Sequence, residues 1–376
     1  MAFGKANSSK IFCRWASLWF ASCLANFNQR FRAHAVLGSY VDDAFGGDKS
    51  YSTARALIRY ITLAGKKHAT LVNVAKTRGP AISMVILGLL YHSGRKTCSL
   101  DPMKVAKYSA HISRLLMQGW ASSKDLERMV GRLEFAAWVE PFGRPLLTFL
   151  STHITPDIPH TTVPLSNMMV ICLRVWRSLL SRNRGLHFSF VLGNLPRMAL
   201  PIFVDASLSG GIGGYCGLRY FSMSMEQLKP WLVSCDGWGS FPKVDIAWLE
   251  LLAACAALYI FTPGVTRRLL SLYSDNTNVV AWLSTRRPPN PFVCAVVAAI
   301  ERVKYCNILK VSTRYISTQH NRTADRLSRG YIPDYLYIRG TRMSPPMKAI
   351  CANLHLDNIV QLWASTIERA TLFTQV

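Results

Sequence analysis

Paired cysteines and long hydrophobic runs are both missing from this chain of 376 residues. Its ten cysteines form no Cys-x-x-Cys pair, and no histidine cluster stands at metal-ligand spacing, which argues against a zinc site and a secreted disulfide framework. We read the cysteines as small buried residues in a reducing compartment. The apolar run at residues 81–90 is too short to span a bilayer. We therefore expect no transmembrane helix, no membrane partner and an intracellular protein, in the cytoplasm or nucleus.

Acidic residues are also scarce, with 20 Asp and Glu against 44 Lys and Arg, for a formal net charge of +24. A basic excess spread along the chain favours a polyanionic partner. Nucleic acid is the first candidate, because Lys and Arg neutralise its phosphates. A membrane surface, or a protein that is basic without a polyanionic partner, is the weaker alternative. Half of the residues are hydrophobic, so the chain is no disordered basic tail.

The order of the predicted elements indicates an α/β protein, α+β overall. Residues 35–45 read as strand, turn and strand, and residues 81–91 as a buried strand. A proline-rich polar stretch at 155–166 is the best linker, followed by a basic amphipathic helix at about 166–182. From residue 200 onward, strands alternate with helices after a glycine-rich hairpin, which is typical of an α/β domain.

Four of the few acids stand at comparable places in this last region. Asp205 and Asp275 close predicted strands, Glu250 lies in a helix and Asp325 begins one. Each alone is more often a turn residue or a helix cap. Together they can converge on one cleft, where four carboxylates would repel one another unless they bind cations. Oxygen ligands suit Mg²⁺, and two Mg²⁺ ions can hold the attacking water and the leaving oxygen of a phosphodiester.

The residues around these acids carry a resemblance. Residues 203–207 (FVDAS), 210–215 (GGIGGY), 249–253 (LELLA), 274–276 (SDN) and 320–329 (HNRTADRLSR) together resemble the ribonuclease H domain that follows reverse transcriptase in retrotransposons of the LTR or DIRS type.

The resemblance implies a mixed-sheet α/β domain that hydrolyses the RNA strand of RNA–DNA hybrids. It makes Asp205, Glu250, Asp275 and Asp325 the catalytic acids, holding two Mg²⁺ ions that Mn²⁺ can replace. It also implies nucleic-acid contacts near the cleft for Asn276, His320 and Asn321. Basic residues are candidates for gripping the hybrid, although each is equally well explained as solvated surface: Arg174, Arg177, Arg182, Arg184, Arg286 and Arg287.

A second resemblance lies near the start of the chain. Residues 39–47 (SYVDDAFGG) resemble the palm motif of reverse transcriptases, and residues 3–12, 65–77 and 86–93 resemble its neighbours in the same order. This implies that Asp42 and Asp43 are catalytic, with Asp42 on the metal, and that Tyr40 and Lys76 contact the template–primer. The third carboxylate of that family lies upstream, yet residues 1–41 contain no Asp or Glu. We therefore expect that this chain alone does not polymerise DNA.

These interpretations divide the chain as follows: a partial palm at 1–95, a helical thumb and connection at 96–154, a linker and basic helix at 155–195, a ribonuclease H-like domain at 196–332 and a tail at 333–376. Two alternatives to a hybrid-cleaving enzyme stay open. One is a catalytically dead remnant that binds nucleic acid through charge. The other is a different nuclease of the ribonuclease H-like superfamily, such as an integrase or resolvase.

Overall fold

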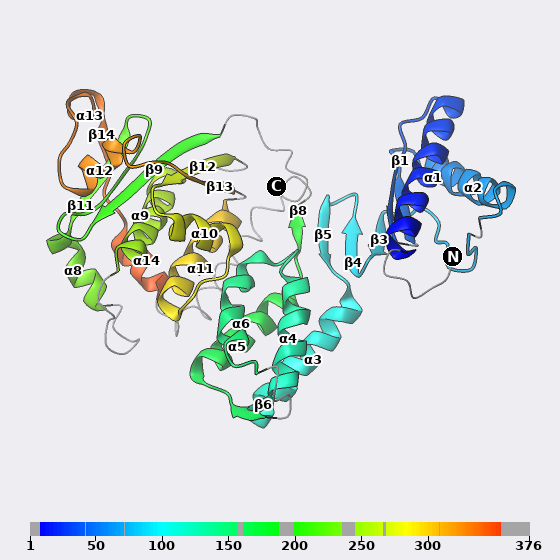
Figure 1. Cartoon of the computed structure of the whole chain (residues 1–376), viewed down its shortest axis with the longest axis horizontal. Coiled ribbons are helices and arrows are strands. Elements are labelled where there is room, and N and C mark those ends of the chain that lie inside the picture. Colours follow the sequence, from blue (N-terminus) through cyan, green and yellow to red (C-terminus); the bar gives the residue numbers. More distant parts are fainter. Residues whose placement is uncertain are drawn as a thin grey trace. The chain divides into compact units, whose positions relative to one another are not determined.

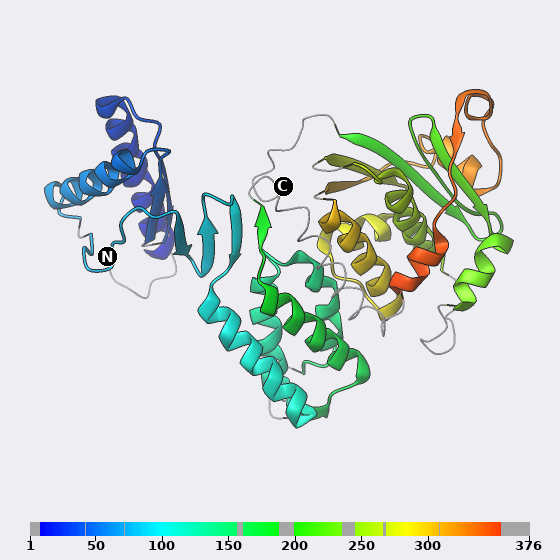
Figure 2. The ribbon, with the colours of Figure 1, turned by 180° about the vertical axis from the view of Figure 1, so that it is seen from behind.

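The computed structural model describes residues 8–41, 43–70, 72–155, 161–187, 199–234, 245–265, 268–307 and 309–354. The chain divides into two compact units, Met1–Arg95 and Lys96–Val376. Helices and mixed sheets confirm the α/β class (Figures 1 and 2).

The first unit is built from helices and β-hairpins: α1 (Ser8–Phe31), β1 (Val36–Tyr40), β2 (Asp43–Gly47), α2 (Tyr51–Lys67), β3 (Ser83–Ile86) and β4 (Leu89–His92). Helix α2 begins after Ser50, whose side chain accepts a hydrogen bond from the Thr53 amide. Its buried Leu57 and Ile61 share a small core with Phe27 of α1. Packing between these two helices therefore stabilises the unit.

The prediction of one buried strand at residues 81–91 is wrong. Strands β3 and β4 pair as an antiparallel hairpin, and the turn between them is formed by Leu87 and Gly88. Both turn residues have positive φ, at 52° and 80°, as a tight two-residue hairpin turn requires.

The second unit opens with a mainly helical part: β5 (Thr97–Leu100), α3 (Pro102–Gln118), β6 (Trp120–Ser122), α4 (Ser123–Ala136), the 3₁₀ helix η1 (Pro141–Leu147), α5 (Thr148–Ser151), β7 (Thr162–Pro164), α6 (Asn167–Arg182) and β8 (Leu186–His187). Helix α6 confirms the helix expected at 166–182 and is capped by Ser166. Its fully buried Trp176 lies over Gly143 of η1, where a Cβ atom would fall 2.5 Å from the indole ring. The missing side chain of Gly143 is what allows this packing.

The rest of the second unit surrounds one mixed sheet: β9 (Leu200–Ser207), β10 (Gly211–Cys216), β11 (Arg219–Ser224), α8 (Met225–Ser234), α9 (Ile246–Phe261), β12 (Leu269–Ser274), α10 (Thr277–Thr285), α11 (Pro291–Cys306), β13 (Lys310–Tyr315), α12 (Arg322–Ser328), α13 (Asp334–Arg339), β14 (Thr341–Arg342) and α14 (Met347–Leu354). The strand order is β13-β12-β9-β10-β11-β14. Strands β9, β10 and β11 are antiparallel neighbours, whereas β12 and β13 run parallel to β9.

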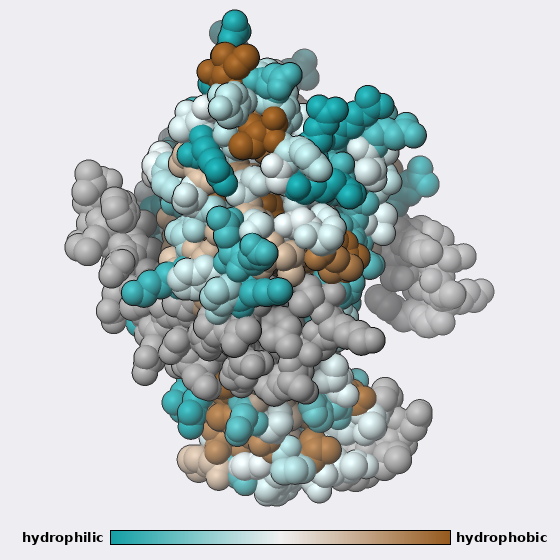
Figure 3. All heavy atoms as spheres, turned by 90° about the vertical axis from the view of Figure 1, so that its left-hand side faces the viewer, coloured by the Kyte–Doolittle hydropathy of each residue, from teal (hydrophilic) through white to brown (hydrophobic). Residues whose placement is uncertain are grey.

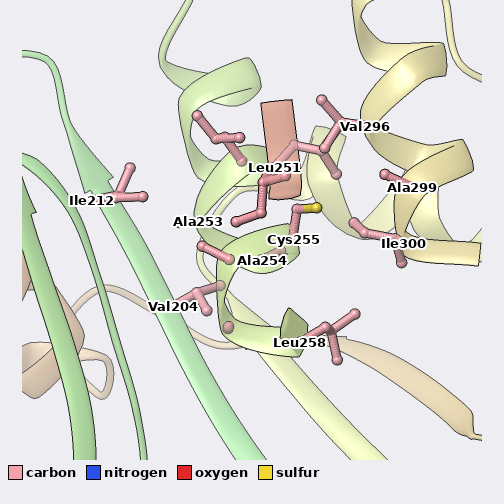
Figure 4. Packing of buried hydrophobic residues seen from close by; sticks show 14 of the residues in the cluster. Val204, Ile212, Leu251, Ala253, Ala254, Cys255, Leu258, Val296, Ala299 and Ile300 are labelled. Carbon is pink, nitrogen blue, oxygen red and sulfur yellow. The ribbon is translucent and has the colours of Figure 1, made fainter. Parts of the chain in front are cut away.

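Helix α9 forms the centre of the core. It is apolar on nearly all sides, as expected for a helix covered by protein all round. Figure 4 shows its Leu251, Cys255 and Leu258 between the sheet, marked by Val204, and helix α11, marked by Ile300. Burying each such side chain contributes about 1.5–3 kcal/mol, so this packing holds α9 firmly against the sheet.

The segment expected to be a tail belongs partly to this core. Helix α14 contributes Met347, Ile350 and Cys351 to the same hydrophobic cluster, and β14 pairs with β11. The core and the sheet therefore extend past residue 332, where the sequence predicts the end of the domain. Sequence missed this because the segment is short and lies among prolines.

Most of the described cysteines are buried, as predicted, but Cys13 is half-buried and Cys306 is exposed. In the described part of the chain, no helix combines the length and the hydropathy needed to cross a membrane. On the coloured atoms of the face in Figure 3, strongly hydrophobic residues stand apart in the upper part and lie nearer together, between more polar residues, in the lower part. Apolar residues that do not join into one large patch are normal on a protein surface.

Candidate metal centre

Three of the four acids expected in the second unit come together. Asp205 of β9, Glu250 of α9 and Asp275 after β12 each place one carboxylate oxygen within 4.8 Å of the others. Among the described residues, no other group of His, Cys, Asp or Glu side chains forms such a cluster. The parallel strands β9 and β12 end at the same edge of the sheet, and α9 packs across it, which brings the three acids together.

Asp205 is almost fully buried on β9. Its Oδ2 accepts a hydrogen bond of 2.6 Å from the Ser328 hydroxyl of α12. Burial raises the pKa of Asp205 to about 7, the Ser328 bond opposes this rise, and the neighbouring carboxylates Asp275 and Glu250 add to it. The carboxyl group is therefore held in one orientation, and a positive charge that acts on it is that of Arg329, which pairs with Asp325.

Glu250 projects from α9 toward the same place. Its carboxylate accepts hydrogen bonds from the Ser274 hydroxyl (2.9 Å) and the Asn276 side-chain amide (3.3 Å). Burial raises its pKa to about 7, the Ser274 bond lowers it, and the charge of Asp275 raises it again. The nucleic-acid role predicted for Asn276 is untested, but its side chain supports Glu250.

Asp275 supplies the clearest sign that a ligand fits here. Its Oδ2 accepts a hydrogen bond of 2.7 Å from Thr318, whereas its buried Oδ1 has no hydrogen-bond partner among the described residues. A buried carboxylate oxygen left unpaired costs free energy unless a cation or a proton satisfies it. Three oxygen donors at this spacing suit a hard divalent cation such as Mg²⁺.

Asp325 lies nearby but outside the three-acid group. Its carboxylate pairs with Arg329, four residues later at the C-terminal cap of α12, at 2.8 Å from Nε. Its charge still raises the pKa of Asp205, so the two carboxylates are close enough to interact. A metal role for Asp325 stays a prediction.

The loop before α12 carries the other two residues expected at the cleft. Asn321 is fully buried and its Nδ2 donates to the Val204 carbonyl of β9, while its Oδ1 has no hydrogen-bond partner among the described residues. His320 is exposed and its Nδ1 lies 2.7 Å from the Ser317 hydroxyl. Asn321 thus ties the loop to the sheet, and His320 faces solvent.

Glycines allow α12 to reach the acids. Gly213 of β10 stands opposite Asp205 in the sheet, and a Cβ atom there would fall 2.4 Å from the Ser328 amide nitrogen. Gly210 is equally close, with a would-be Cβ 2.4 Å from the Ser328 carbonyl oxygen. The glycine-rich hairpin therefore provides the room that lets Ser328 bond to Asp205.

The basic residues proposed to grip a hybrid differ in their surroundings. Arg174 and Arg177 are exposed on α6. Arg286 forms an ion pair with Glu301 at 3.4 Å, and Arg287 with Glu134 at 3.2 Å. Arg182 and Arg184 also have partners within the protein. Arg174 and Arg177 thus face solvent, and neither has a hydrogen bond or ion pair to another described residue.

The residues proposed for the palm lie in the first unit. Asp42 falls outside the described residues. Asp43 begins β2 opposite Tyr40, whose side chain is 60% exposed, and Lys76 is exposed in a turn. Asp43 belongs to no group of three metal-binding side chains in the described part of the chain. Their predicted roles stay untested.

Sequence reasoning missed the hydroxyl groups that hold the carboxylates. Ser274 immediately precedes Asp275, Ser328 lies three residues after Asp325, and Thr318 comes from the loop after β13. The two serines stand inside the quoted motifs. Their position next to the acids was the available signal, although their bonds are to acids elsewhere in the chain.

The raised pKa values predict how stability changes with pH in the absence of metal. Asp205 and Glu250 both have folded-state pKa values above those of unfolded chains. Their contribution to stability is complete below about pH 4 and is lost as pH rises to about 7. In EDTA, we expect the melting temperature to fall by roughly 5 °C between pH 5 and pH 8.

Mg²⁺ should restore most of this loss at pH 8, and Asp205→Asn should reduce the pH dependence. Thermal melts at the two pH values, with and without Mg²⁺, measure both effects. An Asp205→Asn protein with the full wild-type pH dependence would contradict the assignment.

The fold and the site define an α/β protein with a three-carboxylate cluster at one edge of a mixed sheet. No family model matches the chain, and no curated protein matches it. It is similar to three solved structures of a foamy viral protease–reverse transcriptase. The complex with an RNA/DNA hybrid shares 14% sequence identity at a TM-score of 0.37, and the complex with dsDNA shares 15% identity at a TM-score of 0.38. The third, a form labelled dRH in complex with dsDNA, shares 13% identity at a TM-score of 0.34.

The matches cover 80–85% of this chain but only 39–60% of those chains. At these values the similarity assigns neither a family nor an activity, which depend on the residues of the chain itself.

Proposed function

We propose that the second unit is a ribonuclease H-type endonuclease that hydrolyses the RNA strand of RNA–DNA hybrids with the help of Mg²⁺. The observation that carries the proposal is the cluster of Asp205, Glu250 and Asp275, with the unpaired buried oxygen of Asp275. The motifs that resemble ribonuclease H supply these same acids, and the net charge of +24 suits a polyanionic substrate.

The role of each side chain follows from its contacts. Asp205, Glu250 and Asp275 would hold the metal, with Asp325 as a further ligand when it leaves Arg329. Metal ions in such a site lower the pKa of a bound water and stabilise the oxygen that leaves the phosphate. Ser328, Ser274 and Thr318 each donate a hydrogen bond to one carboxylate and so fix its orientation before substrate binds.

For the first unit we propose a reverse-transcriptase palm segment of a retroelement. Its support is the Tyr-Val-Asp-Asp sequence at residues 40–43 and the β1–β2 hairpin on which it falls. Tyr40 and Lys76 are exposed and available to a template–primer. The activity proposed for this chain is hydrolysis, because the described residues bring acids together only in the second unit.

Cleavage by the full chain of four end-labelled substrates of one sequence tests the proposal: an RNA–DNA hybrid, an RNA duplex, a DNA duplex and single-stranded RNA. In Mg²⁺ or Mn²⁺ we expect cutting of the RNA strand of the hybrid, and none in EDTA. Cutting of DNA would instead favour an integrase- or resolvase-like nuclease. Tight binding of the hybrid without cutting would favour the non-enzymatic alternative.

A further inference from the structure

One row of side chains crosses four strands of the sheet beside the metal centre. Tyr215 of β10 pairs with Phe203 of β9, Phe203 with Tyr273 of β12, and Tyr273 with Arg314 of β13. Partners in register point to the same face of a sheet. The four side chains therefore form a continuous row, which we call the Tyr215–Arg314 row.

The rings of this row stand side by side. The centroids of Phe203 and Tyr215 are 4.8 Å apart at an interplanar angle of 11°, and those of Phe203 and Tyr273 are 4.8 Å apart at 13°. At one end of the row, Tyr215 packs against the buried cluster of Tyr220, Leu327 and Leu336. Toward Arg314, the inner ring faces cover one another, so this part of the row offers ring edges and not a flat face to a ligand.

The Arg314 end of the row is open. Phe203 and Tyr273 are half-buried and Arg314 is exposed. Among the described residues, neither the Tyr273 hydroxyl nor the Arg314 guanidinium has a recorded hydrogen bond or ion pair. A phenol and an unpaired cation lie next to each other, which is a combination that suits a phosphate group.

The row runs alongside the carboxylates. Phe203 lies two residues before Asp205 on β9, and Tyr273 of β12 lies two residues before Asp275, which directly follows that strand. Side chains two residues apart point to the same face of a strand and are separated by about 6.6 Å. The row is therefore the first set of side chains on this face behind the metal centre.

We propose that the Tyr215–Arg314 row binds the sugar–phosphate backbone of the nucleic-acid strand held at the metal centre. Arg314 contacts a phosphate next to the one at the carboxylates, the Tyr273 hydroxyl donates to the same backbone, and the ring edges pack against sugars. This inference rests on the proposed function, because it takes that substrate as the ligand.

Two features favour a backbone over other occupants. Bases would need free ring faces to stack on, and the inner faces are already covered. A protein partner would need no continuity with the carboxylates, whereas a nucleic-acid strand bound there can continue directly over the adjoining row. Ring stacking across strands adds about 0.2–1 kcal/mol to stability, which explains the aromatic residues alone but not the exposed Arg314 beside them.

Hybrid binding by single variants of the full chain tests the proposal. Fluorescence anisotropy is measured in Mg²⁺ over a series of salt concentrations, in an Asp205→Asn background that prevents cutting. We expect Arg314→Gln to weaken binding about 3- to 10-fold and to make the slope of log K against log salt shallower by about 0.9, the value for one lost phosphate contact. Tyr273→Phe, which keeps the ring, should weaken binding about 2- to 5-fold with the slope unchanged.

Lys310→Gln and Tyr315→Phe are the matched controls. Lys310 is an exposed cation at the far end of β13, and Tyr315 is one residue from Arg314 and points to the other face. Both should change binding less than about twofold. Arg314→Gln and Tyr273→Phe proteins that bind like their controls would overturn the proposal.

Failure of the proposed function would look different. If the wild type cuts hybrid and the row variants bind normally, the proposed nuclease activity is supported and the proposed binding role of the row is refuted. If the wild type never cuts hybrid but both row variants weaken binding as expected, the binding role of the row is supported and the nuclease activity is refuted.

Discussion

Asp205→Asn or Glu250→Gln is expected to reduce Mg²⁺-dependent cutting of the RNA strand at least about a hundredfold. Loss of residues that merely support a metal ligand already costs 10- to 100-fold, and these two side chains are proposed as the ligands themselves. The neutral side chains keep the size and most hydrogen bonds of the acids but lack the charge that attracts a cation. Initial rates on the labelled hybrid, together with Mg²⁺ titration by calorimetry, measure the effect.

The same substitutions should stabilise the metal-free protein above pH 7. Burial and neighbouring acids raise the pKa of both groups to about 7, so their ionised forms destabilise the fold. Loss of activity together with a higher melting temperature in EDTA separates a metal-binding role from a structural one. Asp334→Asn is the control, because Asp334 is an exposed acid outside the cluster, and it should leave both quantities unchanged. If either cluster variant cut the hybrid at the wild-type rate, the three acids would have no part in the reaction.

Gly213→Ala should have the second largest effect on the protein, on both its stability and its hybrid cleavage. The added Cβ atom would meet the Ser328 amide nitrogen at 2.4 Å and the Leu327 carbonyl carbon at 2.5 Å, and both are backbone atoms. Helix α12 must therefore move away from β10. Because the Ser328 hydroxyl bonds to Asp205 and Asp325 lies on the same helix, the metal centre should be disturbed as well. We expect a loss of about 1–3 kcal/mol in the free energy of unfolding and a loss of most hybrid cleavage.

Gly131→Ala is the control, and it should change the free energy of unfolding in the opposite direction. Gly131 is exposed within α4, where a Cβ atom would meet nothing within 4 Å. Removing a helical glycine should stabilise the protein by about 0.5–1 kcal/mol and leave cleavage unchanged. Urea unfolding and hybrid cleavage of the two alanine variants compare them directly. If Gly213→Ala were as stable and as active as Gly131→Ala, the close approach of α12 would not matter.

Sequence reasoning identified the acids and the elements that carry them. Asp205 and Asp275 stand at the carboxyl ends of strands, Glu250 lies in an apolar helix and Asp325 lies in a short helix, as expected. Such features depend on residues close together in the chain, since strand propensity, helix caps and turn residues act locally. Local patterns failed to place helix α14, which follows Pro345 and Pro346, because its position is decided by the core that it joins.

The residues alone indicated which acids could share a site, predicted an α/β fold and favoured a polyanionic partner. Only the tertiary structure decided that Asp205, Glu250 and Asp275 lie within 4.8 Å of one another and that Asp325 stays outside this group. The same holds for the pairing of Arg287 with Glu134, 153 positions away in the chain. Distances between such side chains depend on strand register and on how closely helices approach the sheet. Packing of the whole unit decides both, and no short stretch of sequence contains them.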